Sequence, residues 1–175
     1  IDILASQIDT HYTQLLLRYQ KILKARNKLL DGIASGRNKV GELDYWDGEL
    51  VACGQKILAA RHKLIAALND EVGECFKRLN NTVDKGERAL KLGYEDTVFS
   101  IDNYTNELAA ARVRDLRYRN TTIGPHRDDW HLTLGSKDVR VSASRGETRA
   151  ALLALKMAEM AVLSRERGEE PVLLL

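Results

Sequence analysis

Ser144-Arg145-Gly146-Glu147-Thr148-Arg149 begins a long apolar helix, predicted from Arg145 to Arg167, and a Pro-led aliphatic strand is predicted after it at Pro171–Leu175. A Ser-x-Gly-Glu turn at the start of a helix presents backbone N–H groups and a hydroxyl to the space in front of it. Such an arrangement suits a phosphate group. An uninterrupted aliphatic run after a helix is typical of a parallel strand buried on both faces. This stretch therefore predicts a helix and a strand beside a phosphate site.

The same six residues also fit a purely structural role. Ser-x-x-Glu is a capping box, in which Ser144 accepts a hydrogen bond from the N–H of Glu147 and the Glu147 carboxylate accepts one from Ser144. Two features favour an anion as well. Gly146 weakens a helix without improving its cap, and Arg145 and Arg149 add positive charge where the helix dipole prefers acids. Both interpretations, a cap and a phosphate site, stay open.

The composition is that of a largely helical chain. It is 44% hydrophobic and 30% charged, and its two prolines are Pro125 and Pro171. The long stretch before Pro125 therefore contains no proline to break a helix. The net charge of +2 is too small to indicate nucleic acid by itself, although residues 112–149 carry nine Lys and Arg against five Asp and Glu, a local net of +4.

The cysteines and termini give expectations about the compartment. If one helix carries both Cys53 and Cys75, they lie ~33 Å apart and cannot pair. Two lone thiols suit a reducing cytoplasm. No apolar run approaches the ~18 residues of a membrane span, and no signal peptide is visible. Because the chain starts at Ile1 without Met and stops inside a strand-like run, we expect an internal segment of a cytoplasmic protein.

Two long helices are predicted in the first half of the chain. Residues 2–30 form the first, a loop follows at 31–42, and residues 43–79 form the second, which spans ~55 Å. Joined by a short polar loop, they make an antiparallel helical hairpin, which we expect to act as an arm or lid. Gly54 or Gly73 permits close packing. Arg26 interrupts the apolar stripe of the first helix. That stripe comprises Ile8, Tyr12, Leu15, Tyr19, Ile22, Leu29 and Ile33. The stripe of the second helix comprises Leu43, Trp46, Leu50, Ile57, Leu64, Leu68, Val72, Cys75 and Leu79.

After the hairpin the pattern becomes mixed. We predict a short strand at 89–94, a helix at 103–118, and a β-hairpin of Trp130–Leu134 and Val139–Val141 around a Gly-Ser turn. The fold class is therefore mixed α/β and mostly α. We expect two domains: a helical lid or arm over 1–118, with the hairpin at 2–79 and the strand and helix at 88–118, and a second domain over 119–175.

Gly124-Pro125-His126-Arg127-Asp128-Asp129 is a second dense motif, 20 residues before Ser144. It contains metal-ligand residue types, and His131 follows closely. Neighbouring ligands seldom converge on one ion without distant partners. The favoured interpretation is a tight loop whose charges cap one another or face water, with no bound metal. A metal-dependent hydrolase that uses this His/Asp loop is a less favoured alternative.

Four arginines lie near the end of the helix predicted at 103–118. As solvated side chains they would complement the negative end of the helix dipole. Alternatively they contact the phosphates of DNA. The four are Arg112, Arg114, Arg117 and Arg119.

Several motifs together resemble the RecF family of bacterial DNA replication and repair proteins, which are ABC-type ATPases of the group that includes the SMC proteins. The resemblance covers essentially the whole chain, and motifs in this order are specific where one alone would be weak. They are Tyr19–Leu30 as Tyr-x-x-x-Leu-x-x-Arg-Asn-x-Leu-Leu, Leu43–Leu50 with Trp46-Asp47, Thr122–Asp129, Ser144–Arg149 as the ABC signature, and Leu152–Glu159 with Pro171–Leu175 as the signature helix and the strand before the Walker B acids.

The resemblance implies an ABC-type ATPase head, here partial over 119–175, with the helical lid attached. It implies a protein that dimerises when ATP, with Mg²⁺, is sandwiched between protomers. The signature residues Ser144, Arg145, Gly146 and Glu147 would lie at the partner's ATP, with the serine and the glycine at its γ-phosphate. It further implies binding of single-stranded or gapped DNA in recombinational repair and the SOS response, with RecR and RecO as partners.

This chain departs from the family in two ways. Glu147-Thr148 stands where many relatives carry Gln-Gln, and a carboxylate only accepts hydrogen bonds, so an amide donor is lost. The 175 residues contain no P-loop and no Walker B acids. Without them phosphoryl transfer lacks its lysine, its Mg²⁺ ligand and its base, so we expect the chain by itself to be inactive. The alternative is a non-enzymatic helical-hairpin interaction module.

Overall fold

A computed structural model describes residues 1–80, 89–168 and 171. The chain forms two compact units that alternate along the sequence. We call the unit of residues 9–60 and 96–128 the helical unit, and the unit of residues 1–8, 61–95 and 129 onward the sheet unit. Each unit is assembled from separate stretches of the sequence, so the two units are not divided at a single boundary after residue 118, as the two predicted domains are. The division into a lid and a head therefore stays a prediction.

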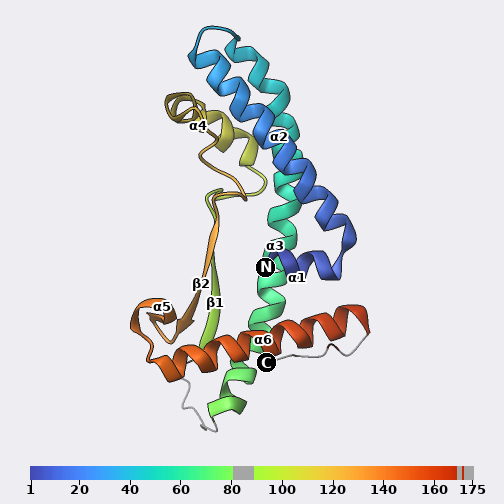
Figure 1. Cartoon of the computed structure of the whole chain (residues 1–175), viewed down its shortest axis with the longest axis vertical. Coiled ribbons are helices and arrows are strands. Elements are labelled where there is room, and N and C mark those ends of the chain that lie inside the picture. Colours follow the sequence, from blue (N-terminus) through green and yellow to red (C-terminus); the bar gives the residue numbers. More distant parts are fainter. Residues whose placement is uncertain (81–88, 169–170, 172–175) are drawn as a thin grey trace. The chain divides into compact units, whose positions relative to one another are not determined.

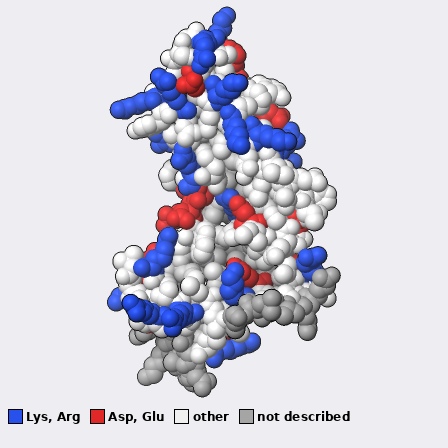
Figure 2. All heavy atoms as spheres, in the orientation of Figure 1, with Lys and Arg blue, Asp and Glu red and all other residues white. Residues whose placement is uncertain are grey.

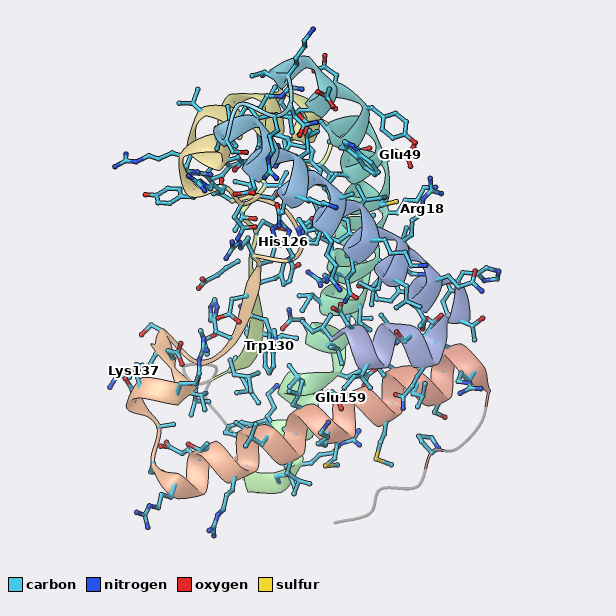
Figure 3. The ribbon with its side chains drawn as sticks, turned by 45° about the horizontal axis from the view of Figure 1, so that its top comes forward. Arg18, Glu49, His126, Trp130, Lys137 and Glu159 are labelled. Carbon is cyan, nitrogen blue, oxygen red and sulfur yellow. The ribbon has the colours of Figure 1, made fainter. Side chains whose placement is uncertain are left out.

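The helical unit is built from α2 (Thr10–Ala34), the 3-10 turn η1 (Val40–Glu42), the first part of α3 (Leu43–Asn80) and α4 (Tyr104–Tyr118). Figure 1 shows α2 and the start of α3 side by side, with α4 next to them. Arg18 of α2 and Glu49 of α3 point toward one another in Figure 3, and Arg18 Nη2 lies 2.6 Å from Glu49 Oε2.

The first helix is broken where the sequence pattern predicts one continuous helix over 2–30. α1 (Asp2–Ile8) ends before Asp9, and α2 starts after it. Asp9 has an extended backbone, and its side chain accepts a hydrogen bond from the N–H of His11 at 2.8 Å. An aspartate in this position is an N-cap, which explains the break. α2 then continues to Ala34, so the predicted loop at 31–42 begins too early.

The second long helix is confirmed almost residue for residue, since α3 covers Leu43–Asn80. Its predicted stripe is buried at most positions, with Leu50, Ile57 and Val72 fully buried and Leu79 exposed. Gly54 has the packing role that was predicted for it or for Gly73. A Cβ on Gly54 would lie 2.6 Å from Cε1 of Tyr104, so only glycine lets α4 come this close to α3.

The sheet unit contains three antiparallel strands in the order β1-β2-β3: Leu90–Glu95, Asp129–Leu134 and Lys137–Asp138. Asn69 of α3 covers the free edge of β1, because its side-chain amide donates to Leu92 O and accepts from Leu92 N, both at 2.8 Å. The helices α1, α5 (Val139–Ser142) and α6 (Arg145–Arg167) complete the unit, and α1 packs against α6.

The prediction of a second hairpin strand at Val139–Val141 is wrong. Residues Val139–Val141 belong to the short helix α5, and β3 has only two residues. Asp138 caps this helix, since its Oδ1 accepts from the N–H of Arg140 at 2.6 Å, and the cap outweighs the β-propensity of two valines. The strand predicted at 172–175 lies outside the described residues.

The described part of the chain is thus mostly helical with a small antiparallel sheet. Both cysteines are buried and free, as the spacing predicted. None of the described helices is both long and apolar enough to cross a membrane.

Candidate functional site

The start of α6 is a complete capping box. Ser144 is the N-cap, with an extended backbone, and its N–H donates to Glu147 Oε2 at 2.8 Å. In return the N–H of Glu147 donates to Ser144 Oγ at 3.3 Å. The predicted cap is therefore confirmed, and it fixes the first turn of a 23-residue helix.

The capping box does not engage every backbone N–H group of this first turn. A helix leaves its first four N–H groups without partners inside the helix, and the capping box takes those of Ser144 and Glu147. Within the part of the chain that the structure describes, the N–H groups of Arg145 and Gly146 have no acceptor, so they can meet solvent or a ligand. Both residues are exposed, and the space around a Cβ on Gly146 is open for 4 Å. The side of Gly146 on which a side chain would lie is therefore open to an incoming group.

Positive charge surrounds the same turn. Arg145 and Arg149 are exposed, and within residues 1–80 and 89–168 neither forms an ion pair. Figure 2 shows Lys and Arg side chains gathered at the lower left, over the region of α5 and the start of α6. Two like charges one turn apart at the positive end of a helix repel each other and the dipole, so an anion would stabilise this arrangement.

Residues 124–128 of the motif form a partly buried loop of the helical unit, and Asp129 begins β2. His126, labelled in Figure 3, lies with Nδ1 2.8 Å from Tyr19 Oη and Nε2 3.1 Å from Thr121 O. Asp128 Oδ1 accepts from both the N–H and the hydroxyl of Thr97, at 2.8 and 2.7 Å. The predicted tight loop is present, but its charged groups do not cap one another: His126 and Asp128 bond to residues outside the motif, and Arg127 and Asp129 are exposed.

The loop also requires a glycine at its start. Gly124 has φ +120°, and a Cβ there would collide with the Tyr104 hydroxyl. His126 is largely buried, and this burial lowers the pKa of its imidazole below the ordinary 6.5. Among the described residues, no group of three or more His, Cys, Asp and Glu side chains could hold a metal ion.

The sequence pattern missed a buried ionic cluster centred on Arg26. This side chain is fully buried; its Nε donates to Asp47 Oδ1 at 2.6 Å, and its Nη1 to Asp115 Oδ2 at 2.7 Å and Thr121 Oγ1 at 2.8 Å. The cluster joins α2, α3, α4 and the loop after α4. The signal was present in the sequence, because a charged residue inside an apolar stripe is buried only with partners.

Three of the four arginines lie on α4 and Arg119 is its C-cap residue, and the four have different surroundings. Arg112 lies 2.6 Å from Asp44 and 2.7 Å from Asp47, so it belongs to the structural cluster. Arg119 has a left-handed backbone and lies 3.2 Å from Asp31. Arg114 donates from Nε to Thr122 Oγ1 at 2.8 Å, and Arg117 lies over the Tyr118 ring. Arg114 and Arg117 are exposed and are the better candidates for a ligand.

Comparison with curated proteins gives long matches to DNA replication and repair proteins, although no family model matches the chain. The chain is 34% identical to the RecF of Agathobacter rectalis over 175 residues, 34% to that of Roseiflexus castenholzii over 189 and 37% to that of Chloroflexus aurantiacus over 188. Each match covers 100% of the chain and 47% of the relative. The chain thus spans about half the length of the curated relatives it matches.

Solved structures of RecF proteins also match the chain. The chain matches the recombination mediator protein RecF-ATP of the RecFOR pathway with a TM-score of 0.90 and 31% identity, over 99% of the chain and 48% of that protein. RecF-ATPrS of the same pathway gives a TM-score of 0.85 and 29% identity, over 94% and 45%. Fold and sequence together define a segment of a DNA replication and repair protein. The chain belongs to the RecF family.

Proposed function

We propose that this chain supplies the ABC signature and a lid to an ATP-dependent DNA-binding protein of recombinational repair. The observation that carries this proposal is the start of α6, where the exposed residues Arg145 and Gly146 have N–H groups outside the capping box and Arg149 is exposed one turn later. Backbone donors at the positive end of a helix are suited to a phosphate. The match to a RecF-ATP structure supports ATP as the source of that phosphate.

Ser144 can serve the cap and the phosphate at once. Its Oγ accepts the N–H of Glu147, and a hydroxyl has one proton to donate in addition to the lone pairs that accept. We propose that this proton, together with the N–H of Gly146, meets the γ-phosphate of ATP held by a second protomer. Arg145 adds positive charge, and Glu147 holds the cap in place of an amide donor.

ATP with Mg²⁺ would carry the phosphates that join the two protomers, so dimerisation would follow the nucleotide state. The residues of this chain would bind and orient the phosphate. We place the groups that hold Mg²⁺ and activate water outside this sequence, since it contains no P-loop lysine and no Walker B acids. The chain by itself is therefore expected not to hydrolyse ATP.

We further propose that the dimer binds single-stranded or gapped DNA, with Arg112, Arg114, Arg117 and Arg119 on the DNA-facing side. One α4 surface carries too little charge for tight binding, and two copies would double it. The RecFOR pathway of the matched structures supports RecR and RecO as partners. DNA damage repair, replication restart and the SOS response in the cytoplasm are the setting that this function implies.

The proposal is tested on a protein with the full length of the relatives that carries this chain. Light scattering with and without Mg-ATP measures dimerisation, and fluorescence anisotropy with a gapped duplex measures DNA binding. We expect ATP to drive both. A protein that binds ATP tightly yet stays monomeric would overturn the proposed role of the signature.

A further inference from the structure

A groove of about 520 Å³ opens on the surface of the helical unit. Its lining is mostly apolar and includes the small side chains Ala110 and Ala111 of α4 and Ile123 of the following loop. Phe99 and Arg114 also line it. The groove therefore combines a floor of small residues, an aromatic ring and a cation.

The aromatic ring is presented on a fixed backbone. Phe99 is 95% exposed, which is unusual for a residue of this size. Its N–H donates to Glu107 Oε2 at 2.9 Å, and the N–H of Ser100 donates to Glu107 Oε1 at 3.0 Å. The carboxylate of α4 thus anchors the loop while leaving the ring in solvent, and both of its oxygens are already engaged.

The cation is held in a similar way. Arg114 Nε donates to Thr122 Oγ1 at 2.8 Å, which ties the guanidinium to the loop after α4. Among the described residues its Nη1 and Nη2 have no hydrogen-bond partner. Arg117, one turn further along α4, is exposed as well. Among the residues that line the groove, Arg114 is therefore the charged one whose N–H groups are left for a ligand, because both oxygens of Glu107 accept backbone N–H groups.

We infer that this groove receives an unstacked base of single-stranded DNA, which stacks on Phe99 while Arg114 contacts the base or its phosphate. The inference rests on the proposed function and assigns the DNA contact to named residues. A nucleobase offers a flat apolar face next to an anion, which matches a ring beside a free guanidinium. An apolar protein segment would fill the floor but would leave Nη1 and Nη2 of Arg114 without a partner.

The experiment uses the full-length protein with Mg-ATP and two labelled probes, an oligo(dT) of about 16 nucleotides and a blunt duplex of equal length. The test variants are Phe99→Ala, Phe99→Trp and Arg114→Gln. Val113→Ala is the matched control, because Val113 is 80% exposed on α4 and does not line the groove. Thermal melting checks that every variant folds.

Phe99→Ala should weaken oligo(dT) binding about 5- to 150-fold, the range expected for losing one base stack, with little change for the duplex. Phe99→Trp should keep the affinity, and its emission should be quenched on binding. Binding of oligo(dT) by Phe99→Ala at parental affinity would overturn the groove assignment and leave the proposed function standing. Failure of the parent to bind either probe would instead overturn the proposed function, and the inference with it.

Discussion

Arg26 Nη1 donates a 2.7 Å hydrogen bond to Asp115 Oδ2, and both side chains are fully buried although 89 residues separate them in the sequence. Asp115 uses its other oxygen for the loop after α4, since Oδ1 accepts from the N–H and the hydroxyl of Thr122 at 2.9 and 2.6 Å. One ion pair thus connects α2 and α4 to the loop that contains the His126 motif.

Replacing Arg26 by Met should destabilise the helical unit strongly. The apolar side chain fills similar space but leaves the buried carboxylate of Asp115 without its cation, which costs about 3–5 kcal/mol. Urea unfolding followed by circular dichroism measures the loss. Arg18→Met is the matched control, because its partner Glu49 lies at the surface and such pairs contribute little. Equal stability of Arg26→Met and the parent would show that the cluster is not a stabilising element.

His126 should make stability depend on pH. Burial lowers the pKa of its imidazole in the folded chain below the ordinary 6.5. The unfolded chain therefore binds a proton more readily, so the free energy of unfolding should fall as the pH drops below about 6.5. Because Thr121 O can only accept, Nε2 carries the proton of the neutral ring and Nδ1 accepts from Tyr19. Protonation of Nδ1 removes the lone pair that accepts from Tyr19, so this bond must reverse its direction.

The measurement compares the free energy of unfolding of the parent and His126→Gln between pH 7.5 and pH 5, a window chosen to span the ordinary histidine pKa. The variant should be less stable at neutral pH but should lose less stability on acidification. His11→Gln is the control, since His11 is largely exposed. A parental slope in His126→Gln would assign the pH dependence to other groups.

The apolar periodicity predicted most helices because it reports burial on one face directly. α3 and α6 began and ended within one or two residues of their predicted bounds. The break at Asp9 and the helical turn at Val139–Val141 were missed because each depends on one side-chain cap, which competes with a longer pattern. Local capping bonds of this kind outweigh propensity over three or four residues.

The candidate sites were predicted unevenly for a physical reason. The capping box at Ser144 depends on residues three apart, so the sequence contains all of it. The partners of Arg26 lie 21, 89 and 95 residues away, and no local pattern can supply them. The same holds for Arg112, whose carboxylate partners lie on α3. The groove at Phe99 arises from three separate segments and was not predicted.

The chain by itself should neither bind ATP tightly nor hydrolyse it. The start of α6 offers two backbone donors, a hydroxyl and exposed arginines, and these suit one end of a triphosphate only. Isothermal titration of the 175-residue chain with Mg-ATP should give no saturable heat at micromolar concentrations. A micromolar dissociation constant would show that the chain contains an ATP site that its motifs do not predict.

Ser144→Arg in the full-length protein should abolish ATP-dependent dimerisation and hydrolysis while keeping ATP binding by one protomer. The bulky side chain would occupy the space in front of the helix where the partner's phosphate is proposed to lie. Ser144→Ala separates this effect from capping, since it removes the cap at a cost of ~1 kcal/mol without adding bulk. Light scattering and phosphate release are the readouts. Normal dimerisation of Ser144→Arg would leave Ser144 with its capping role alone.

The arginines of α4 should set the salt dependence of DNA binding. Each arginine that no longer neutralises a DNA phosphate should reduce the slope of log affinity against log salt by about 0.7–0.9. Replacing Arg112, Arg114, Arg117 and Arg119 by Gln should lower affinity for all sequences alike and flatten that slope. Because Arg112 and Arg119 are ion-paired within the helical unit, Arg114→Gln with Arg117→Gln should account for most of the effect on DNA.

The complementary pair, Arg112→Gln with Arg119→Gln, should instead lower the melting temperature more than the DNA affinity. Lys24→Gln with Lys28→Gln removes the same charge from exposed positions of α2 and controls for net charge. Fluorescence anisotropy with a gapped duplex at several salt concentrations gives affinity and slope together. If the quadruple variant keeps both, the DNA surface lies elsewhere on the protein, and the arginines of α4 serve only to hold the helix and its loop in place.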